Sequence, residues 1–172
     1  MKLICRHISQ TPDPYLARLK VEARDKGDQC IANAILRNSR DEILVLRRSK
    51  DRSMFPLCWD LPGGHIDKNE SLESGLAREV KEEVGVPLLS IDALIAHWIW
   101  THPKYPTQRM QQFDFLATLD PKVPIRLNLE EFVEARWLAV DELWMLQEYR
   151  APEDKAMRNV LRHAFQLMGK LT

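Results

Sequence analysis

The most constraining stretch of this chain runs from Gly63 to Val86 and has the sequence GGHIDKNESLESGLAREVKEEVGV. It contains five glutamates and one aspartate, whereas the whole chain of 172 residues carries 25 acidic and 25 basic residues and a net charge of zero. Ser71 is a suitable N-cap, and Gly85 stands where a left-handed residue ends a helix, so the pattern predicts a helix over residues 71–84. The positions of the acidic residues on this helix decide whether it is a solvated surface or a site.

Three of the acidic side chains share one side of the predicted helix. Glu79, Glu82 and Glu83 are spaced i, i+3 and i+4, which at about 100° per residue places them in one arc beside the apolar stripe. Like charges at this spacing cost about 0.2–0.5 kcal/mol, and the macrodipole disfavours negative charge near the C-terminus of a helix. A divalent cation reverses each of these effects, and clustered carboxylates suit Mg²⁺ or Mn²⁺. For the glutamates alone, a solvated acidic helix is the competing interpretation.

Gly75 lies one turn before Glu79, within the same arc. Glycine in a helix interior costs about 0.8–1.0 kcal/mol relative to alanine. The missing side chain could let a ligand or a neighbouring backbone come close, and simple tolerance of the glycine is an equally good interpretation.

The rest of the chain alternates between helix and strand patterns. Turn-forming residues between two short apolar runs, 30–37 and 42–48, predict a β-hairpin, while Pro62, Gly63 and Gly64 interrupt regular structure. The other predicted elements are helices over 12–25, 141–149 and 153–171 and strands over 89–100, 111–119 and 134–140. This order predicts an α+β fold in which helices pack on a mixed sheet.

The composition is that of a soluble globular chain with balanced charge. Hydrophobic residues make up 45% and charged residues 29%, and the length suits one domain. Zero net charge does not indicate a broad basic face for nucleic acid, and no segment approaches the ~20 apolar residues that span a bilayer. Cys5, Cys30 and Cys58 show no metal-like spacing and predict reduced thiols, and the start of the chain lacks the apolar run of a signal peptide. We therefore expect a cytoplasmic protein without a nucleic-acid or membrane partner.

The spacing of the acidic stretch matches a known motif without a gap or substitution. The residues that carry the match are Gly64, Glu70, Arg78, Glu79, Val80, Glu82, Glu83, Gly85 and Val86. This pattern resembles the Nudix box, and the segments WDLPGG and EARWLAVDEL resemble the usual flanks of that family, so the resemblance extends from about Cys30 to Leu146. It implies an α/β/α sandwich around a mixed β-sheet. We expect a single Nudix hydrolase domain over residues 1–172, with an N-terminal helical extension over 1–28 that caps the sheet or contributes to a homodimer interface.

The resemblance also implies a metal-dependent chemistry. Family members typically hydrolyse a nucleoside diphosphate linked to another moiety, with Mg²⁺ or Mn²⁺ as cofactor. It assigns Glu79, Glu82 and Glu83 to the catalytic and metal-binding set, with Glu79 as a ligand or as the general base, and Gly63 to the metal shell through its backbone carbonyl. Metal ions held there would neutralise pyrophosphate oxygens and activate a water molecule. The number of ions and the identity of the base stay open.

Other charged residues are assigned supporting roles. Arg78 is grouped with the catalytic residues and is expected to orient a box glutamate through an ion pair, while Glu70 matches a position that supports the metal site less directly. Many relatives also recruit a later acidic residue as a second base or ligand. The candidates are Glu130, Glu131 and Glu134, and for each one a surface charge is the competing interpretation.

Four further residues are predicted to lie outside the site. Trp59 and Trp137 stand at positions that the family uses for its core. Glu73 and Asp67 match no position of the motif and are predicted to be surface charges.

Residues around the predicted site are candidates for substrate contacts. Arg47, Arg48, Lys50 and Arg52 follow an apolar run and could hold phosphates, although for each one a solvated basic loop is as good an interpretation. One of Trp98, Trp100 and Tyr105 could stack on a base, with packing against a helix as the alternative.

These assignments predict hydrolysis of a pyrophosphate bond in a nucleoside diphosphate derivative, by attack of water at phosphorus. The small-molecule substrate we favour is a nucleoside triphosphate or a related nucleotide, with ADP-ribose or a nucleotide sugar as the alternative. The alternative of another class is a non-catalytic nucleotide-binding regulator, but such domains often lose box glutamates and none is lost here. An isomerase would need histidines near Cys58, which the sequence does not supply.

Overall fold

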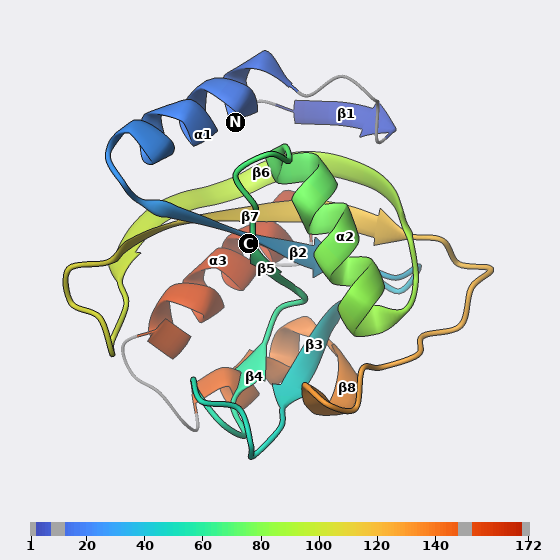
Figure 1. Cartoon of the computed structure of the whole chain (residues 1–172). Helices are drawn as coiled ribbons and strands as arrows, with labels where there is room; N and C mark the ends of the chain where they lie inside the picture. Colours follow the sequence, from blue (N-terminus) through green and yellow to red (C-terminus); the bar gives the residue numbers. More distant parts are fainter. Residues whose placement is uncertain (1–2, 8–12, 148–152, 170–172) are drawn as a thin grey trace.

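The computed structural model describes residues 3–7, 13–147 and 153–169 (Figure 1). The elements in chain order are β1 (Leu3–His7), α1 (Pro14–Asp25), β2 (Gln29–Leu36), β3 (Ile43–Arg48), β4 (Trp59–Asp60), β5 (Gly63–His65), α2 (Leu72–Val84), β6 (Leu88–Thr101), β7 (Arg109–Leu119), β8 (Phe132–Leu138), the 3₁₀ helix η1 (Val140–Gln147) and α3 (Glu153–Leu167). Most of the helices and strands expected from the sequence are therefore present, with bounds shifted by a few residues.

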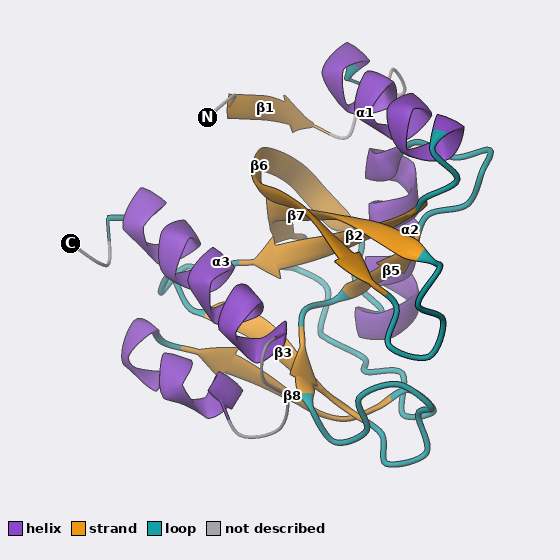
Figure 2. Cartoon of the chain, turned by 90° about the vertical axis from the view of Figure 1, so that its left-hand side faces the viewer, coloured by secondary structure: helices purple, strands orange, loops and turns teal. Residues whose placement is uncertain are grey.

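The strands form two sheets. Five strands lie in the order β1-β6-β7-β2-β5, and three lie in the order β4-β3-β8. β2 and β7 are parallel and the other pairs of the larger sheet are antiparallel, so this sheet is mixed. α2 covers one face of the larger sheet and α3 covers the other (Figures 1 and 2). The predicted α+β fold, an α/β/α sandwich around a mixed sheet, is confirmed.

Alternation along the strands divides the core into two clusters. Leu44 and Leu46 of β3 belong to the cluster under α1 and α2, whereas Val45 between them belongs to the cluster with α3 and η1. Successive side chains of a strand point to opposite faces, so a strand buried on both faces presents a continuous apolar run. Trp59 is buried in the second cluster and Trp137 packs against the first, as predicted for core residues.

α2 is fixed at both ends by the residues predicted to cap it. The Ser71 side chain accepts a hydrogen bond from the Ser74 N–H, and the Ser74 side chain accepts one from the Ser71 N–H. At the other end Gly85 has a φ of 73°, and its N–H donates to the carbonyl oxygen of Lys81 at 3.0 Å. These caps fix the phase of the helix and therefore the direction of its glutamates.

The predicted hairpin of residues 30–37 and 42–48 is wrong. β2 pairs with β7 and β5 in the larger sheet, whereas β3 pairs with β4 and β8. Within the described ranges the two strands share one isolated bridge, between Arg37 and Ile43. The turn chemistry is present, since Asn38 Oδ1 accepts two backbone N–H groups of the turn. The strands diverge after the turn because each is buried on both faces and finds longer partners elsewhere.

The segment around Pro62 is more regular than predicted. Gly63 and Gly64 belong to β5, an edge strand that pairs with β2. Gly63 has a φ of 142°, and a Cβ there would lie 2.2 Å from the carbonyl oxygen of Ala32. The close pairing therefore requires glycine, and the same residues that weaken a strand in isolation allow this one to form.

Three predicted element ends fall outside the described residues. The predicted short helix over 141–149 is the 3₁₀ helix η1, and its last two residues are not described. Pro12, where the first helix was expected to begin, and Leu171, where the last was expected to end, are also outside the described ranges.

The N-terminal segment contains a strand as well as the predicted helix. β1 pairs antiparallel with β6 at the edge of the larger sheet. α1 begins after the N-cap Asp13 and buries Leu16, Leu19 and Ala23 in the same cluster as α2. α1 is therefore packed into the domain core.

Two of the three cysteines can be placed. Cys30 and Cys58 are buried, while the side chain of Cys5 is outside the described part of the chain. In the described ranges, no helix has the length and apolar character needed to span a membrane.

Candidate active site

A cavity of about 540 Å³ lies beside the edge strand β5, between α2, the loop after β3 and the sheet face that α3 covers. The predicted site residues that line it are Gly63, Glu79, Glu82, Glu83, Arg48, Trp98, Trp100 and Glu131. Those that do not line it are Glu70, Arg78, Arg47, Tyr105, Glu130 and Glu134. One cavity therefore joins the box glutamates to part of the ring-rich strand.

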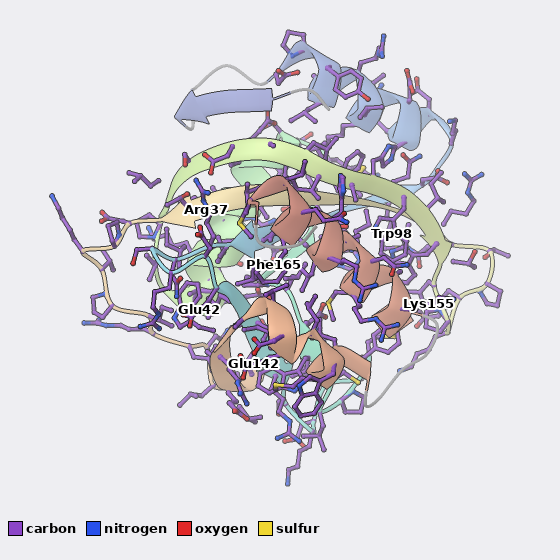
Figure 3. All side chains as sticks on the ribbon, turned by 180° about the vertical axis from the view of Figure 1, so that it is seen from behind. Arg37, Glu42, Trp98, Glu142, Lys155 and Phe165 are labelled. Atoms are coloured by element: carbon purple, nitrogen blue, oxygen red, sulfur yellow. The ribbon has the colours of Figure 1, made fainter. Side chains whose placement is uncertain are left out.

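The glutamates reach this cavity past the edge of the larger sheet. α2 lies on one face, whereas Trp98 and Gln112 lie on the face covered by α3, where Figure 3 shows Trp98 beside that helix. Between them stands β5, whose Gly63 and Gly64 carry no side chains. A Cβ on Gly64 would lie 2.5 Å from Glu79 Oε2. The absence of a side chain at Gly64 therefore lets the Glu79 carboxylate lie against the edge strand.

Glu83 is the most buried box glutamate of the cavity. It is 5% exposed, and its Oε2 accepts a 2.8 Å hydrogen bond from the Gly63 N–H. Burial raises the pKa of Glu83 well above its ordinary value; the Gly63 bond opposes this rise, and nearby carboxylates such as Asp60 and Glu79 add to it. Burial and the neighbouring carboxylates therefore make the ionised form of Glu83 unfavourable, and a bound cation would relieve this cost.

Glu79 and Glu82 differ from Glu83 in exposure. Glu79 is half-buried, and its Oε1 accepts a hydrogen bond from Arg78 Nη1 at 2.8 Å. Burial raises the pKa of Glu79 despite this bond, and the carboxylates of Glu82 and Glu131 contribute to the rise. Glu82 is exposed, with Oε2 at 3.3 Å from the same nitrogen. The three side chains thus run from the buried floor of the cavity to its rim.

Arg78 ties this helix to the loop before it. Its guanidinium donates to both carboxylate oxygens of Glu70, at 2.6 and 3.2 Å, and to the carbonyl oxygen of His65 at 3.0 Å. The same group donates to Glu79 and Glu82. These hydrogen bonds, with Glu70 first, raise the pKa of Arg78 above its ordinary value, so the group stays charged. Its contacts match the ion pairing expected from the sequence.

Glu70 anchors the loop that precedes α2. Its Oε1 accepts the N–H of Asp67 at 2.8 Å as well as the bond from Arg78, which is the main cause that lowers the pKa of Glu70. A Cβ on Gly75 would lie 2.7 Å from Glu70 Oε1 and 2.6 Å from Ile66 Cδ1. Loop side chains, rather than a ligand, therefore fill the space beside Gly75.

Glu73 is not the surface charge that was predicted. Its Oε1 accepts the N–H of Asp13 at 2.8 Å, and its Oε2 is buried, with no hydrogen-bond partner in the described part of the chain. Glu73 joins the N-terminus of α1 to the first turn of α2. Sequence spacing could not reveal this contact because 60 positions separate the two residues. Asp67 is exposed, as predicted.

Of the three later glutamates, Glu131 lines the cavity. Its carboxylate pairs with Arg52 at 2.9 Å. Glu134 pairs with Arg47 at 3.7 Å across β3 and β8, and Glu130 is exposed in the turn before β8. Glu131 is therefore the later carboxylate placed to act with the box glutamates.

Arg48 and Arg52 bring positive charge to the same cavity. Arg48 donates to the carbonyl oxygen of Met54 at 3.0 Å and pairs with Asp60 at 3.3 Å. Arg47 instead donates to the carbonyl oxygen of Leu57 at 3.3 Å and pairs with Glu134, and it does not line the cavity. The prediction that both arginines contact the substrate is not supported for Arg47.

Aromatic side chains of β6 and the following loop form the opposite wall. Trp98, Trp100 and His102 follow one another at every second position and line the cavity. The ring centroids of Trp98 and Trp100 are 6.4 Å apart, as are those of Trp100 and His102. Tyr105 packs on His102 but is 59% exposed and lies outside the cavity.

A chain of hydrogen bonds holds the two tryptophans. Trp100 Nε1 donates to Gln112 Oε1 at 3.0 Å, and Gln112 Nε2 donates to Asp114 Oδ1 at 2.9 Å. The other oxygen of Asp114 accepts the indole N–H of Trp98 at 2.9 Å. Because an indole N–H only donates and a carboxylate only accepts, this chain permits one orientation of the Gln112 amide. Burial raises the pKa of Asp114 to about 6, although these hydrogen bonds lower it.

Neither Gln112 nor Asp114 was predicted from the sequence, and Asp60 was not predicted either. For the first two, the available signal was the alternation of polar Gln112 and Asp114 with the apolar Phe113 and Phe115. For Asp60, which follows a buried tryptophan in the two-residue strand β4, no comparable pattern exists.

The donor set suits a hard divalent cation, which prefers carboxylate and carbonyl oxygens. Among the described residues, no three carboxylate, imidazole or thiolate side chains already converge as a finished metal centre. Arg78 binds Glu79 and Glu82, and the Gly63 N–H binds Glu83. A cation would compete with these partners. Burial, with a smaller contribution from neighbouring carboxylates, raises the pKa of Glu79 and Glu83, and the charge of a cation would offset both effects.

The NUDIX domain family model matches residues 29–162, which include the whole acidic stretch and the cavity. The chain is a Nudix hydrolase. The match begins after α1, so the first helix of this Nudix hydrolase lies outside it.

Relatives and solved structures agree with this assignment. An uncharacterised Nudix hydrolase of Nostoc sp. is 27% identical over 127 residues, which cover 72% of this chain and 73% of that protein. An RNA pyrophosphohydrolase of Nitratiruptor sp. is 37% identical over 87 residues, which cover 46% of this chain and 56% of that protein. The MutT protein of Methanosarcina mazei superposes with a TM-score of 0.66 at 25% identity, over 83% of this chain and 95% of that one. This Nudix hydrolase therefore shares its fold with proteins of several activities.

Proposed function

We propose that this Nudix hydrolase cleaves a pyrophosphate bond by attack of water at phosphorus, and that its substrate is a nucleoside triphosphate or a related nucleotide. One observation carries the proposal: the buried carboxylates of α2 and the tryptophans of β6 face the same cavity of about 540 Å³. A nucleotide has the matching pair of features, a polyphosphate and an aromatic base joined by one sugar.

The carboxylate wall would hold the cofactor. Glu79, Glu82 and Glu83, with the backbone of Gly63, would bind Mg²⁺ or Mn²⁺, which when bound neutralises phosphate oxygens and makes the attacking water more acidic. Glu79 and Glu131 are the two candidates for accepting the proton of that water, because both face the cavity beside the other carboxylates.

The arginines of the loop side would orient the polyphosphate. Arg48 and Arg52 line the cavity, each already paired with one acidic residue. A phosphate oxygen can replace or share such a partner, because a guanidinium has five N–H donors. Their charge offsets part of the negative charge that the carboxylates place around a bound polyphosphate.

The ring wall would bind the base. The faces of Trp98 and Trp100 give a surface on which a base can stack, a contact worth about 1–3 kcal/mol. The Gln112 amide, whose orientation the Asp114 chain fixes, has a second N–H and a second lone pair that can meet the polar edge of the base. Trp98 and Trp100 are the members of the predicted ring set that line the cavity, whereas Tyr105 does not.

The test is a panel of nucleotides with identification of the products. Nucleoside triphosphates, dinucleoside polyphosphates, ADP-ribose, nucleotide sugars and RNA with a 5′-triphosphate would each be incubated with Mg²⁺, with Mn²⁺ or with a chelator. We expect phosphoanhydride cleavage of at least one compound with either metal and none with the chelator. Cleavage that is equally fast in the chelator would contradict the proposal.

The panel includes RNA and ADP-ribose because of the similarity to other proteins. An RNA pyrophosphohydrolase is among the sequence relatives, and an ADP-ribose pyrophosphatase of Streptococcus suis shares the fold at 19% identity with a TM-score of 0.58. We favour small nucleotides over RNA because the net charge of the chain is zero. A homodimeric assembly and a cytoplasmic location remain predictions.

Two other classes are less well supported. A non-catalytic regulator would not need Glu79, Glu82 and Glu83, and all three are present and face the cavity. An isomerase that uses a cysteine would need Cys58 at the site, but its Sγ lies 3.6 Å from the carbonyl oxygen of Pro56 and the residue does not line the cavity. Binding of a nucleotide without turnover, in metal and across the whole panel, would favour the regulator.

A further inference from the structure

We propose that Lys20 of α1 is a positioning residue for the metal-binding face of α2. The inference rests on the proposed function, in which Glu79 and Glu82 bind the cation. Lys20 precedes the region that the family model matches, so this role belongs to the N-terminal segment of this chain.

Lys20 holds three carbonyl oxygens of the loop that precedes α2. Its Nζ donates to the carbonyl oxygen of Asp67 at 2.5 Å, to that of Lys68 at 3.3 Å and to that of Glu70. An ammonium group has three N–H donors, and the loop offers a partner to each of them. A single cation therefore gathers the backbone of a four-residue turn.

α1 gives this ammonium group a rigid support. Leu16, Leu19 and Ala23, on both sides of Lys20, are buried in the core cluster with α2. At the start of the helix the Asp13 N–H donates to Glu73 of α2 at 2.8 Å. α1 is thus anchored to the core and to α2, so Lys20 holds the loop from a fixed point rather than from a fraying surface helix.

Glu70 and Arg78 connect the loop that Lys20 holds to the carboxylates of the cavity. Lys20 binds the backbone carbonyl of Glu70, and the Glu70 carboxylate binds Arg78 through two hydrogen bonds. Arg78 in turn donates to Glu79 and Glu82. Four contacts therefore connect α1 to the carboxylates that would bind the metal.

The direction of the effect follows from competition for these carboxylates. A cation that binds Glu79 and Glu82 competes with Arg78 for their negative charge, and Glu70 retains the guanidinium while it does so. A loosened loop weakens the hold of Glu70 on Arg78, which then competes more strongly with the cation. Loss of Lys20 should therefore weaken metal binding and slow turnover, with little effect on recognition of the base.

The experiment compares Lys20→Met with Lys26→Met. Both changes remove one positive charge from the same helical segment, and lysine and methionine have similar helix propensities. Lys26 is the exposed C-cap residue of α1. Lys20→Arg, which keeps the charge and the donors, tests for rescue. Mn²⁺ binding is measured by electron paramagnetic resonance, and kcat and KM are measured with the best substrate of the panel.

We expect Lys20→Met to raise the dissociation constant for Mn²⁺ about three- to tenfold, because Glu70 and Arg78 transmit only part of the roughly 10- to 150-fold effect of hydrogen bonds from a charged group. It should lower kcat with KM for the nucleotide nearly unchanged, while Lys26→Met behaves as the wild type and Lys20→Arg is intermediate. The measurement is made well below the unfolding temperature of each variant. The same Mn²⁺ affinity in Lys20→Met and in the wild type would overturn the proposal.

A second readout uses metal-free protein and so does not depend on the proposed function. Hydrogen exchange of the Glu70 amide and of the Arg78 Nε–H is compared by NMR, because both report on the loop and its ion pair. Faster exchange in Lys20→Met but not in Lys26→Met supports the proposal even if the protein hydrolyses nothing in the panel. Unchanged exchange at both positions contradicts it, whatever the enzyme does.

Discussion

The two walls of the cavity depend on the sequence in different ways. The carboxylate wall consists of the glutamates of α2, and the ring wall consists of Trp98 and Trp100 with their hydrogen-bond partners on β7. The carboxylate wall comes from one stretch of α2, where Glu79, Glu82 and Glu83 lie within five residues of one another. The ring wall joins residues 12 and 16 positions apart, Trp100 with Gln112 and Trp98 with Asp114, through the pairing of β6 with β7. Local spacing therefore reveals the first wall in the sequence, while the second depends on strand register.

The two walls also differ in how their polar groups are satisfied. In the ring wall, the indole N–H groups and the Asp114 carboxylate are joined in one chain of hydrogen bonds. In the carboxylate wall, burial and mutual repulsion raise the pKa of Glu79 and Glu83. The first arrangement stabilises a fixed shape, and the second is poised to accept a cation.

The largest effect is expected from Glu83→Gln. This change tests whether the buried carboxylate is needed for catalysis although it does not stabilise the folded protein. Loss of one metal-binding charge should lower kcat/KM about 1000-fold, since metal-assisted charge stabilisation is worth several kcal/mol. Burial raises the pKa of Glu83, so its ionised form disfavours the folded state at neutral pH, and a neutral glutamine can still accept the Gly63 N–H. Without metal, the unfolding temperature should not fall.

The control for this prediction is Glu130→Gln, which changes an exposed glutamate outside the cavity. It should leave kcat/KM within about twofold of the wild type, as expected for a surface charge. Full activity of Glu83→Gln would show that the carboxylate wall is not the metal site.

Asp114→Asn tests the ring wall through the pH dependence of stability. Burial raises the pKa of Asp114 from 3.8 to about 6, so between these values the folded protein keeps a proton that the unfolded chain has released. Its contribution to the free energy of unfolding should therefore fall as the pH rises from about 4 to about 6, by up to about 3 kcal/mol, and stay level above that.

Urea unfolding between pH 4 and 7 measures this contribution as the difference in slope between Asp114→Asn and the wild type. Other carboxylates titrate in the same range, but they are common to both proteins and cancel in the comparison. Identical slopes would show that Asp114 titrates normally and that the wall is wetter than its burial indicates.

Trp100→Ala tests whether the ring wall recognises the base. It should raise KM for the best nucleotide about tenfold with a smaller change in kcat, because stacking of a base on an aromatic ring contributes about 1–3 kcal/mol. Tyr105→Ala removes an exposed ring outside the cavity and should change neither constant. Equal effects of the two substitutions would mean that the wall is structural and the base binds elsewhere.

The smallest difference is expected between Glu131→Gln and Glu134→Gln, which probe how far the carboxylate wall extends. Glu131 lines the cavity, so its change should lower kcat by about tenfold or more if it takes part in proton transfer. Glu134 pairs with Arg47 outside the cavity, and exposed pairs of this kind contribute about 0–1 kcal/mol. A larger loss of activity in Glu134→Gln than in Glu131→Gln would show that Glu131 is not the second base.

The helix and the grouping of its glutamates could be predicted because they depend on neighbours in the sequence. Ser71 and Gly85 mark the ends of α2, and the period of the helix groups Glu79, Glu82 and Glu83. What failed depended on pairing between distant segments. The turn at Asn38 is correct in its chemistry, yet the strands beside it join different sheets because other partners bury more of their surface.

The same limit applies to the candidate site. Glu73 and Glu131 are both acidic residues in polar segments. Glu73 contacts Asp13 because α1 packs on α2, whereas Glu131 lines the cavity because of the path of the chain before β8. Arg47 and Arg48 are adjacent and identical in type, yet Arg47 pairs with Glu134 outside the cavity and Arg48 pairs with Asp60 inside it. A sequence pattern identifies such residues as candidates but does not choose among them.

The central claim, that one cavity joins a metal site on α2 to the tryptophans of β6, can be tested with a small amount of Mn²⁺ and NMR of ¹⁵N-labelled protein. We predict that the amide signals of Gly63 and Gly64 broaden first and the indole signals of Trp98 and Trp100 next. The amide of Thr118 should stay sharp, because it lies six residues beyond Gln112 on β7, about 20 Å away at ~3.3 Å per residue. Equal broadening of Thr118 and Gly63, or an unchanged pattern in Glu83→Gln, would contradict the account.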